Sequence, residues 1–159
     1  PFLVDGKDVI SESCAIQFYL AEKRPERGLI PDSLSDRAQI YRWMFFLATE
    51  IEQPLWRIAL HTHMYSETDR LAEAVPLAMR DGEEMIAVFE DHMKDRQFVV
   101  GDRLSIADFN AAFTLDWARE AGLLGQAPRL NAFVDDMYAR PKAPMTIEAG
   151  FAELRRQIG

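Results

Sequence analysis

Ser11, Glu12 and Ser13 form a short polar stretch that could bind the headgroup of an amino acid. Ile16 and Leu20 follow at helical spacing, so the stretch lies directly before a predicted helix. A helix N-terminus offers free N–H groups and a positive dipole end to a carboxylate, and an adjacent glutamate can pair with an ammonium group. Serine is also a preferred N-cap residue. The stretch therefore has two interpretations: a serine that only caps the helix, or a site that binds a zwitterion.

Cysteine and histidine side chains offer two other kinds of chemistry. Cys14 lies in the same helix, where a free cysteine is usually a small packing residue, and we predict that role over a reactive thiol. His61 and His63 are two residues apart in a predicted helix and point to different faces. No recognisable ligand cluster surrounds them, so the sequence predicts no metal site.

Composition excludes several classes of function. The chain has 159 residues and a formal net charge of -8, which argues against a nucleic-acid partner because phosphate binding depends on clustered lysine and arginine. No stretch approaches the roughly 18 unbroken apolar residues that a membrane helix needs. A single cysteine and the lack of a recognisable signal peptide predict a reducing, cytoplasmic setting.

The first 31 residues predict a hairpin followed by a helix. Phe2–Val4 and Val9–Ile10 read as short strands, with Asp5-Gly6 as the turn pair between them. A lone hairpin is marginal in water, so we expect these strands to belong to a larger sheet whose other strands lie outside this sequence. Pro25 and Pro31 bound a charged linker, which divides the chain into residues 1–31 and 32–159.

A long helix is predicted from Asp32 or Ser35, as its cap, to about Met64. Pro54 removes a backbone donor and should kink the helix near Glu50. The helix carries two apolar seams, the first formed by Ile40, Met44, Leu47, Ile51, Leu55 and Ile58, and the second by Tyr41, Phe45, Ala48, Trp56 and Ala59. Two apolar faces imply burial on both sides, either inside the domain or against a second subunit.

Ser105 and Asp108 have the spacing of a capping box, which predicts a well-defined helix start. The helix should end at Gly122. Its apolar residues are Ile106, Phe109, Phe113 and Trp117, flanked by Ala107, Ala111, Ala112 and Ala118. Small residues let neighbouring helices approach closely, so this helix should be central and buried.

Three further helices complete a mainly α prediction. One runs from Leu71 to Arg96 and contains two residues of low helix propensity, Pro76 and Gly82. Another is bracketed by prolines, from Pro128 to Arg140-Pro141, and an amphipathic helix covers about 147–158.

Several local patterns, taken in order, resemble the glutathione S-transferase family. They are Pro1-Phe2-Leu3-x-Asp5-Gly6, Ile10-Ser11-Glu12-Ser13-x-Ala15-Ile16-x-x-Tyr19-Leu20, Gly101 with Ser105-Ile106-Ala107-Asp108, and Arg140-Pro141. The resemblance implies an all-helical bundle of the family's C-terminal type, preceded by a partial thioredoxin-like β-β-α unit.

The resemblance also implies a function and a site. The intact protein would conjugate glutathione thiolate to small hydrophobic electrophiles, as a homodimer, with glutathione as co-substrate and no metal. Glu12 and Ser13, with Pro1, would bind glutathione. The candidates for the electrophile pocket are Trp56, Leu60 and His63, although aromatic residues at helical spacing also simply pack in cores. The family's thiolate-activating residue precedes the Pro1 position, so this chain should contain no catalytic residue.

One alternative belongs to another functional class. Several proteins of this fold serve as non-catalytic dimerisation or scaffold modules, and the two-faced helix from Asp32 onward would suffice for that role. Within the enzyme interpretation, conjugation, peroxidase and isomerase activities all remain open.

Overall fold

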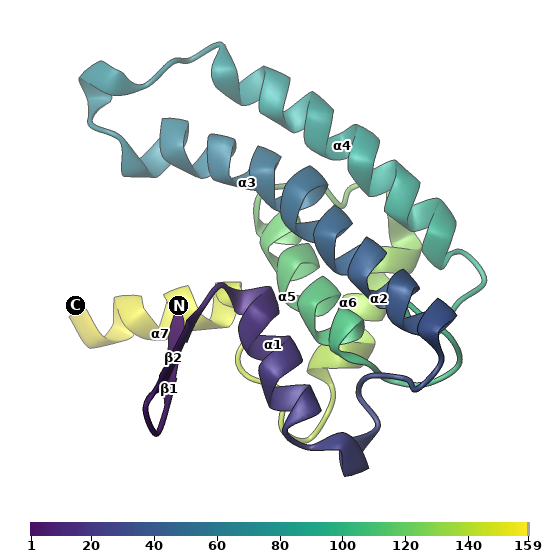
Figure 1. Ribbon diagram of the computed structural model, residues 1–159. Coiled ribbons are helices and arrows are strands. Elements are labelled where there is room, and N and C mark those ends of the chain that lie inside the picture. Colours follow the sequence, from purple (N-terminus) through teal and green to yellow (C-terminus); the bar gives the residue numbers. More distant parts are fainter. Residues whose placement is uncertain (159) are drawn as a thin grey trace.

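The computed structural model describes residues 1–158 and is mainly α-helical, as predicted (Figure 1). Two strands and seven α-helices follow one another along the chain: β1 (Phe2–Asp5), β2 (Asp8–Ser11), α1 (Ser13–Glu22), α2 (Leu34–Phe46), α3 (Glu52–Ala59), α4 (Ala74–Met93), α5 (Ile106–Glu120), α6 (Pro128–Tyr138) and α7 (Ile147–Ile158). Short 3₁₀ turns lie at Pro25–Arg27 and Glu67–Asp69.

The hairpin forms, but its turn is shifted by one residue from the predicted pair. Asp5 pairs with Asp8, which leaves Gly6 and Lys7 as the two turn residues. Gly6 has φ 63°, a conformation that glycine adopts without steric cost at the first central position of a type II′ turn. Phe2 is 74% exposed, and the described residues contain no third strand beside the pair.

The long predicted helix is a continuous helical run from Leu34 to Met64 with two π-helical turns. The first turn spans Leu47–Ile51, directly before Pro54, and the second spans Leu60–Met64. Proline cannot donate to the carbonyl four residues earlier, so the predicted disturbance near Glu50 takes the form of a π turn. The cap is Ser33, whose hydroxyl accepts from Asp36 N at 3.4 Å, and the prediction of Asp32 or Ser35 was wrong.

The two apolar seams of this run have different surroundings. The first seam is fully buried from Ile40 to Leu55. In the second seam Phe45 is 64% exposed and Tyr41 is also exposed, so the domain itself does not bury this face. The described residues therefore do not bury Tyr41 and Phe45 of the second seam, and burial of these residues against a second subunit stays a prediction.

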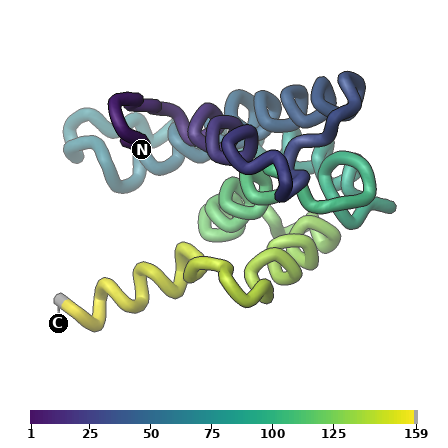
Figure 2. The backbone as a smooth tube through the Cα atoms, turned by 60° about the horizontal axis from the view of Figure 1, so that its bottom comes forward, coloured from purple at the N-terminus to yellow at the C-terminus, as the bar shows by residue number. Residues whose placement is uncertain are grey.

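Helix α5 runs through the middle of the helical body (Figure 2). The predicted capping box is present: Asp108 accepts from Ser105 N at 2.7 Å and from Val99 N at 2.8 Å. Ala111 is fully buried, whereas Phe109 and Phe113 are exposed. The core therefore packs on the small residues of α5, and much of the aromatic seam points to the surface.

Helix α4 lies beside α3 and is shorter than predicted at both ends (Figure 1). Pro76 is tolerated because it falls in the first turn, where its missing N–H would have no partner. Gly82 does not interrupt the helix. A Cβ at this position would lie 2.8 Å from Leu123 Cδ1, so the glycine allows α4 to approach its neighbours closely.

Side chains of α5 fix the two C-terminal helices. Arg119 Nη1 donates to Asp135 Oδ1 of α6 at 2.9 Å. Asp116 accepts from the backbone N–H of Ile147 at 2.8 Å, which anchors the start of α7 against α5. No helix of the described chain is long and apolar enough to cross a membrane.

Candidate functional site

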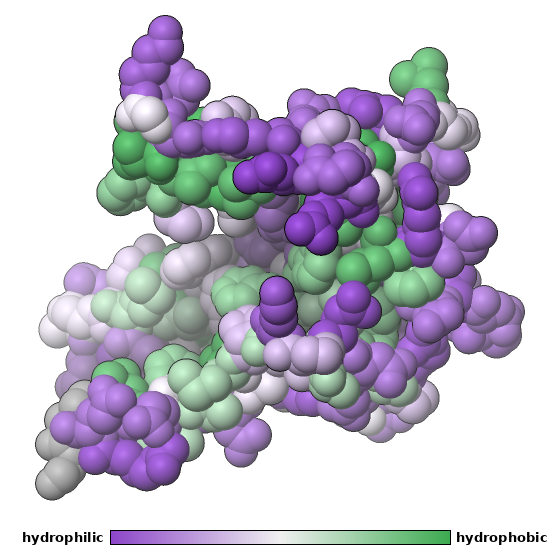
Figure 3. Space-filling view, turned by 90° about the horizontal axis from the view of Figure 1, so that it is seen from below, coloured by the Kyte–Doolittle hydropathy of each residue, from purple (hydrophilic) through white to green (hydrophobic). Residues whose placement is uncertain are grey.

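A cleft of ≈ 890 Å³ opens between helices α1, α3, α5 and α7. The space-filling view shows the molecule hollowed between an upper and a lower lobe, with hydrophobic side chains along the border (Figure 3). Ile147 and Phe151 of α7 line one side of the cleft, and the hydrogen bond from Ile147 N to Asp116 holds the start of this helix against α5.

The cleft brings together four of the six predicted site residues. Pro1, Ser13, Trp56 and His63 all line it, although they come from distant parts of the chain. Glu12 and Leu60 are not among the lining residues. Glu12 lies directly beside Ser13 and is exposed, and Leu60 begins the second π turn.

The start of α1 lacks the serine cap that the sequence predicts. The N-cap residue is Glu12, and no side chain caps the first turn. Glu12 has φ 69° and ψ 120°, and no other non-glycine residue of the described chain has a positive φ. Such backbone strain costs about 1–3 kcal/mol and is often found at ligand sites. The first N–H groups of α1 thus remain available beside Ser13.

Polar side chains that the sequence analysis missed form the floor of the cleft. Glu52 lines it from α3 and accepts from Thr114 Oγ1 at 2.9 Å. Burial raises the pKa of Glu52, and the Thr114 hydrogen bond partly opposes this shift. Gln17 Nε2 donates to Asn110 Oδ1 at 3.1 Å, which joins α1 to α5.

Aromatic side chains form the wall next to this floor. Trp56 and Trp117 meet edge to face, with ring centroids 5.1 Å apart. Phe113 lines the same cleft, and Trp56 is 47% exposed. The cleft therefore combines a polar end at Ser13 with an apolar aromatic side that can bind flat hydrophobic molecules.

Cys14 packs behind the cleft instead of lining it. Its side chain is half-buried, and its thiol lies 3.9 Å from Asn110 Oδ1. Burial, together with the negative charge of Glu52, raises the pKa of the Cys14 thiol. A thiol with a raised pKa is a poor nucleophile, which agrees with a packing role.

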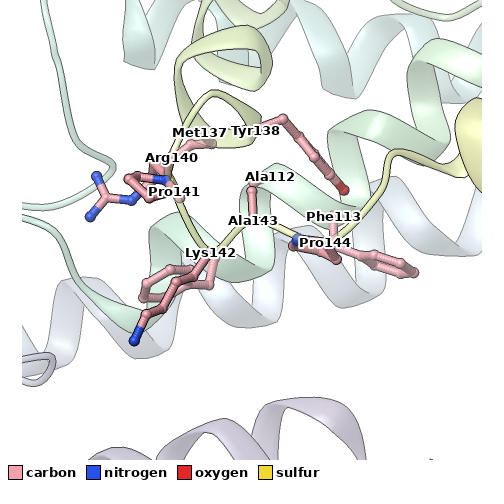
Figure 4. Close-up of a pocket in the computed structure, with 10 residues that line it drawn as sticks. Ala112, Phe113, Met137, Tyr138, Arg140, Pro141, Lys142, Ala143 and Pro144 are labelled. Carbon is pink, nitrogen blue, oxygen red and sulfur yellow. The ribbon is translucent and has the colours of Figure 1, made fainter.

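A second hollow of ≈ 560 Å³ lies on the other side of Phe113. Figure 4 shows Ala112 and Pro144 facing this space, while the charged ends of Arg140 and Lys142 extend away from it. Burial and the carboxylate of Asp116 raise the pKa of Tyr138, at its edge, to about 12. This hollow contains none of the predicted site residues.

Within residues 1–158, no three histidine, cysteine or acidic side chains, His61 and His63 included, come together as a group that could hold a metal ion. The His61 ring accepts from Leu71 N at 3.1 Å. This contact helps to hold the turn between the second π turn and α4.

Comparison with protein families identifies the helical part of the chain. Residues 47–141 match the family model described as glutathione S-transferase, C-terminal domain. The chain belongs to the glutathione S-transferase family. The resemblance seen in the sequence is thus confirmed, and helices α3 and α5, which line the cleft, lie within the part of the chain that matches this C-terminal domain.

Individual family members agree with this assignment over most of the chain. Glutathione S-transferase F9 of Arabidopsis thaliana is 30% identical, over 92% of this chain and 72% of the relative. Glutathione S-transferase GstA of Escherichia coli O157:H7 is 28% identical, over 92% and 71%. The zeta-class enzyme of Euphorbia esula is 34% identical, over 68% of this chain and 48% of its own length.

Solved structures share the fold. A glutathione S-transferase from Xylella fastidiosa matches with a TM-score of 0.77 and 28% identity, over 89% of this chain and 70% of that one. Ure2p in complex with glutathione matches with a TM-score of 0.74 and 25% identity, over 84% and 66%. The chain therefore spans about 70% of the length of several relatives that it matches.

Proposed function

We propose that the intact protein is a glutathione transferase that joins glutathione to small hydrophobic electrophiles. In this reaction the glutathione thiolate forms a C–S bond with the electrophilic carbon, and the leaving group departs with its electron pair. One observation carries the proposal: a single cleft has the uncapped start of α1 at one end and an aromatic wall beside it. Ure2p, a solved structure of the same fold, is in complex with glutathione.

The polar end of the cleft would bind glutathione. Ser13 at the first turn of α1 can donate to a carboxylate, and the free N–H groups of that turn add to the positive potential. Glu12 would pair with the ammonium group from beside the cleft, and Pro1 would contact the peptide. The support for Ser13 and Pro1 is that both line the cleft, whereas Glu12 does not.

The aromatic side of the cleft would bind the electrophile. Trp56 and His63 line it, and Leu60 adjoins them in the same helical run. In this proposal residues 1–31 form part of a thioredoxin-like glutathione-binding domain and residues 32–159 the helical domain.

The proposed reaction uses no thiolate-activating residue from this chain and no metal. The single cysteine supports a reducing, cytoplasmic setting.

The exposed face of α2 favours a second proposal, that the protein forms a homodimer. Leu34 is 83% exposed, and Tyr41 and Phe45 continue the same apolar face. An apolar face of this kind marks an interaction surface. The same face would serve a non-catalytic dimerisation module, so self-association alone does not separate the two functions.

Conjugation of 1-chloro-2,4-dinitrobenzene by the protein expressed from its complete gene tests the enzyme proposal. We expect glutathione-dependent product formation, and we expect Trp56→Ala to lower kcat/KM for the electrophile by roughly twofold to tenfold through lost aromatic contact. Leu77→Ala, at an exposed position of α4 outside the cleft, is the control. Absence of conjugation in a folded dimer would favour the module instead.

A further inference from the structure

Glu52 is a half-buried carboxylate with no lysine or arginine partner among residues 1–158. Its Oε1 accepts from the Thr114 hydroxyl at 2.9 Å, and no lysine or arginine of the described chain forms an ion pair with it. The cation nearest in sequence, Arg57, is paired with Asp81 at 2.6 Å instead. Charges that are withdrawn from water are normally paired. The carboxylate of Glu52 therefore faces the cleft with its charge uncompensated.

The remaining charges of the cleft do not provide that compensation. Among the described residues that line it, none is a lysine or arginine, and the one basic side chain is His63. Glu120 adds a second, exposed carboxylate at the rim. The acidic side chains that line the cleft thus have no lysine or arginine beside them, and the charge of Glu52 also helps to raise the pKa of the Cys14 thiol behind the cleft.

Two tryptophan side chains line the same cleft as the Glu52 carboxylate. Trp56 follows Glu52 by one helical turn on the same face of α3, and Trp117 meets Trp56 at 5.1 Å. Aromatic faces attract cations through the ring quadrupole, and a carboxylate beside them adds a charge-assisted hydrogen bond. Aromatic rings and a carboxylate in one cleft can together bind an aromatic molecule that carries a positively charged nitrogen.

We propose that Glu52 selects, among electrophilic substrates, aromatic compounds with a cationic nitrogen group. This inference rests on the proposed function, because it concerns the second substrate of the same cleft. An anionic substrate would meet Glu52 and Glu120 without a counter-charge, and a neutral one would leave Glu52 unpaired. The ammonium group of glutathione can also pair with Glu52. The experiment must therefore distinguish an ion pair with glutathione from an ion pair with the second substrate.

A matched series of ligands provides the test without any turnover. The dissociation constants of 1-naphthylmethylamine, 1-naphthalenemethanol and 1-naphthoate can be measured by quenching of tryptophan fluorescence, in the absence of glutathione and at low salt. We expect the amine to bind about tenfold more tightly than the alcohol, and the carboxylate to bind most weakly. Equal affinities for the three ligands would overturn the proposal.

The variant Glu52→Gln should reduce the advantage of the amine over the alcohol to within about twofold. Its amide oxygen can still accept from Thr114, so the fold should be retained, which circular dichroism would check. Glu50→Gln is the matched control, because Glu50 lies two residues away, is exposed and does not line the cleft. An amine advantage that survives in Glu52→Gln would refute the role of this carboxylate.

Calorimetric titration with glutathione separates the two sources of the cation. If Glu52→Gln binds glutathione as the native protein does while losing its preference for the amine, the cationic group belongs to the second substrate. If glutathione affinity falls and the amine preference stays, Glu52 binds the ammonium group of glutathione and the proposal is wrong. A native protein that bound no glutathione would contradict the proposed function, while the ligand series would still test the charge preference of the cleft.

Discussion

Asp108 should be one of the most stabilising side chains of this protein. It is fully buried, and its carboxylate accepts from Val99 N at 2.8 Å, from Ser105 N at 2.7 Å and from Ser105 Oγ at 2.9 Å. Removing the carboxylate leaves two buried backbone N–H groups without an acceptor, at about 1–3 kcal/mol each. Asp108→Ala should therefore lower the free energy of unfolding by about 2–6 kcal/mol.

Urea denaturation followed by circular dichroism measures this loss. Asp102→Ala is the control, because Asp102 is an exposed carboxylate in the same loop and should change stability by no more than about 0.5 kcal/mol. Ser105→Ala should cost less than Asp108→Ala, since it removes a hydroxyl and leaves the Asp108 carboxylate in place to accept from the two backbone N–H groups. A loss below about 1 kcal/mol for Asp108→Ala would refute the view that this capping box anchors the central helix.

Four further substitutions test three separate features of the structure. Burial raises the pKa of Glu52 above its ordinary value of 4.5, so stability should fall as pH rises from that value through the folded-state pKa. Glu52→Gln should therefore raise the melting temperature at about pH 8 and have little effect at about pH 4, and equal shifts at both would contradict this account. Gly82→Ala should destabilise by about 1–3 kcal/mol in urea because its Cβ would meet Leu123 at 2.8 Å, whereas Gly150→Ala in α7, with nothing within 4 Å, should stabilise by a few tenths to 1 kcal/mol. Glu12→Gly should raise the free energy of unfolding by about 1 kcal/mol by relieving the strain at φ 69°, and a loss of stability would show that the residue is not strained.

Local signals in the sequence predicted the helices whose ends depend on single residues. Ser105 and Asp108 form the expected capping box, and prolines bracket α6 as expected. Caps with competing candidates were harder to place, because Ser33, Asp32 and Ser35 all have side chains that can accept from a first turn. The prediction of a serine cap for α1 was wrong for a different reason. A strained Glu12 occupies the cap position, and no propensity predicts a non-glycine residue with positive φ.

The cleft could be predicted only in part. Ser13 and Trp56 were found because a polar helix start and an aromatic stripe are visible in the sequence, and both line the cleft. Glu52 and Asn110 were missed because they come from distant helices, and a single polar residue in a helix looks like part of a solvated face. The signal was present for Asn110, a polar residue that stands in the sequence between Phe109 and the small residues Ala111 and Ala112. The outward direction of Phe113 depends on which face of α5 the core selects, and spacing alone does not decide that.

Calorimetric titration of glutathione into the native protein and into Ser13→Ala tests the central claim most directly, that this cleft is a glutathione site. Ser11→Ala is the matched control, because Ser11 is a neighbouring serine in β2 that does not line the cleft. We predict that the native protein and Ser11→Ala bind glutathione alike, and that Ser13→Ala binds it about tenfold to a hundredfold more weakly through loss of a charge-assisted hydrogen bond. Glutathione binding that is absent from the native protein, or unchanged in Ser13→Ala, would contradict the account.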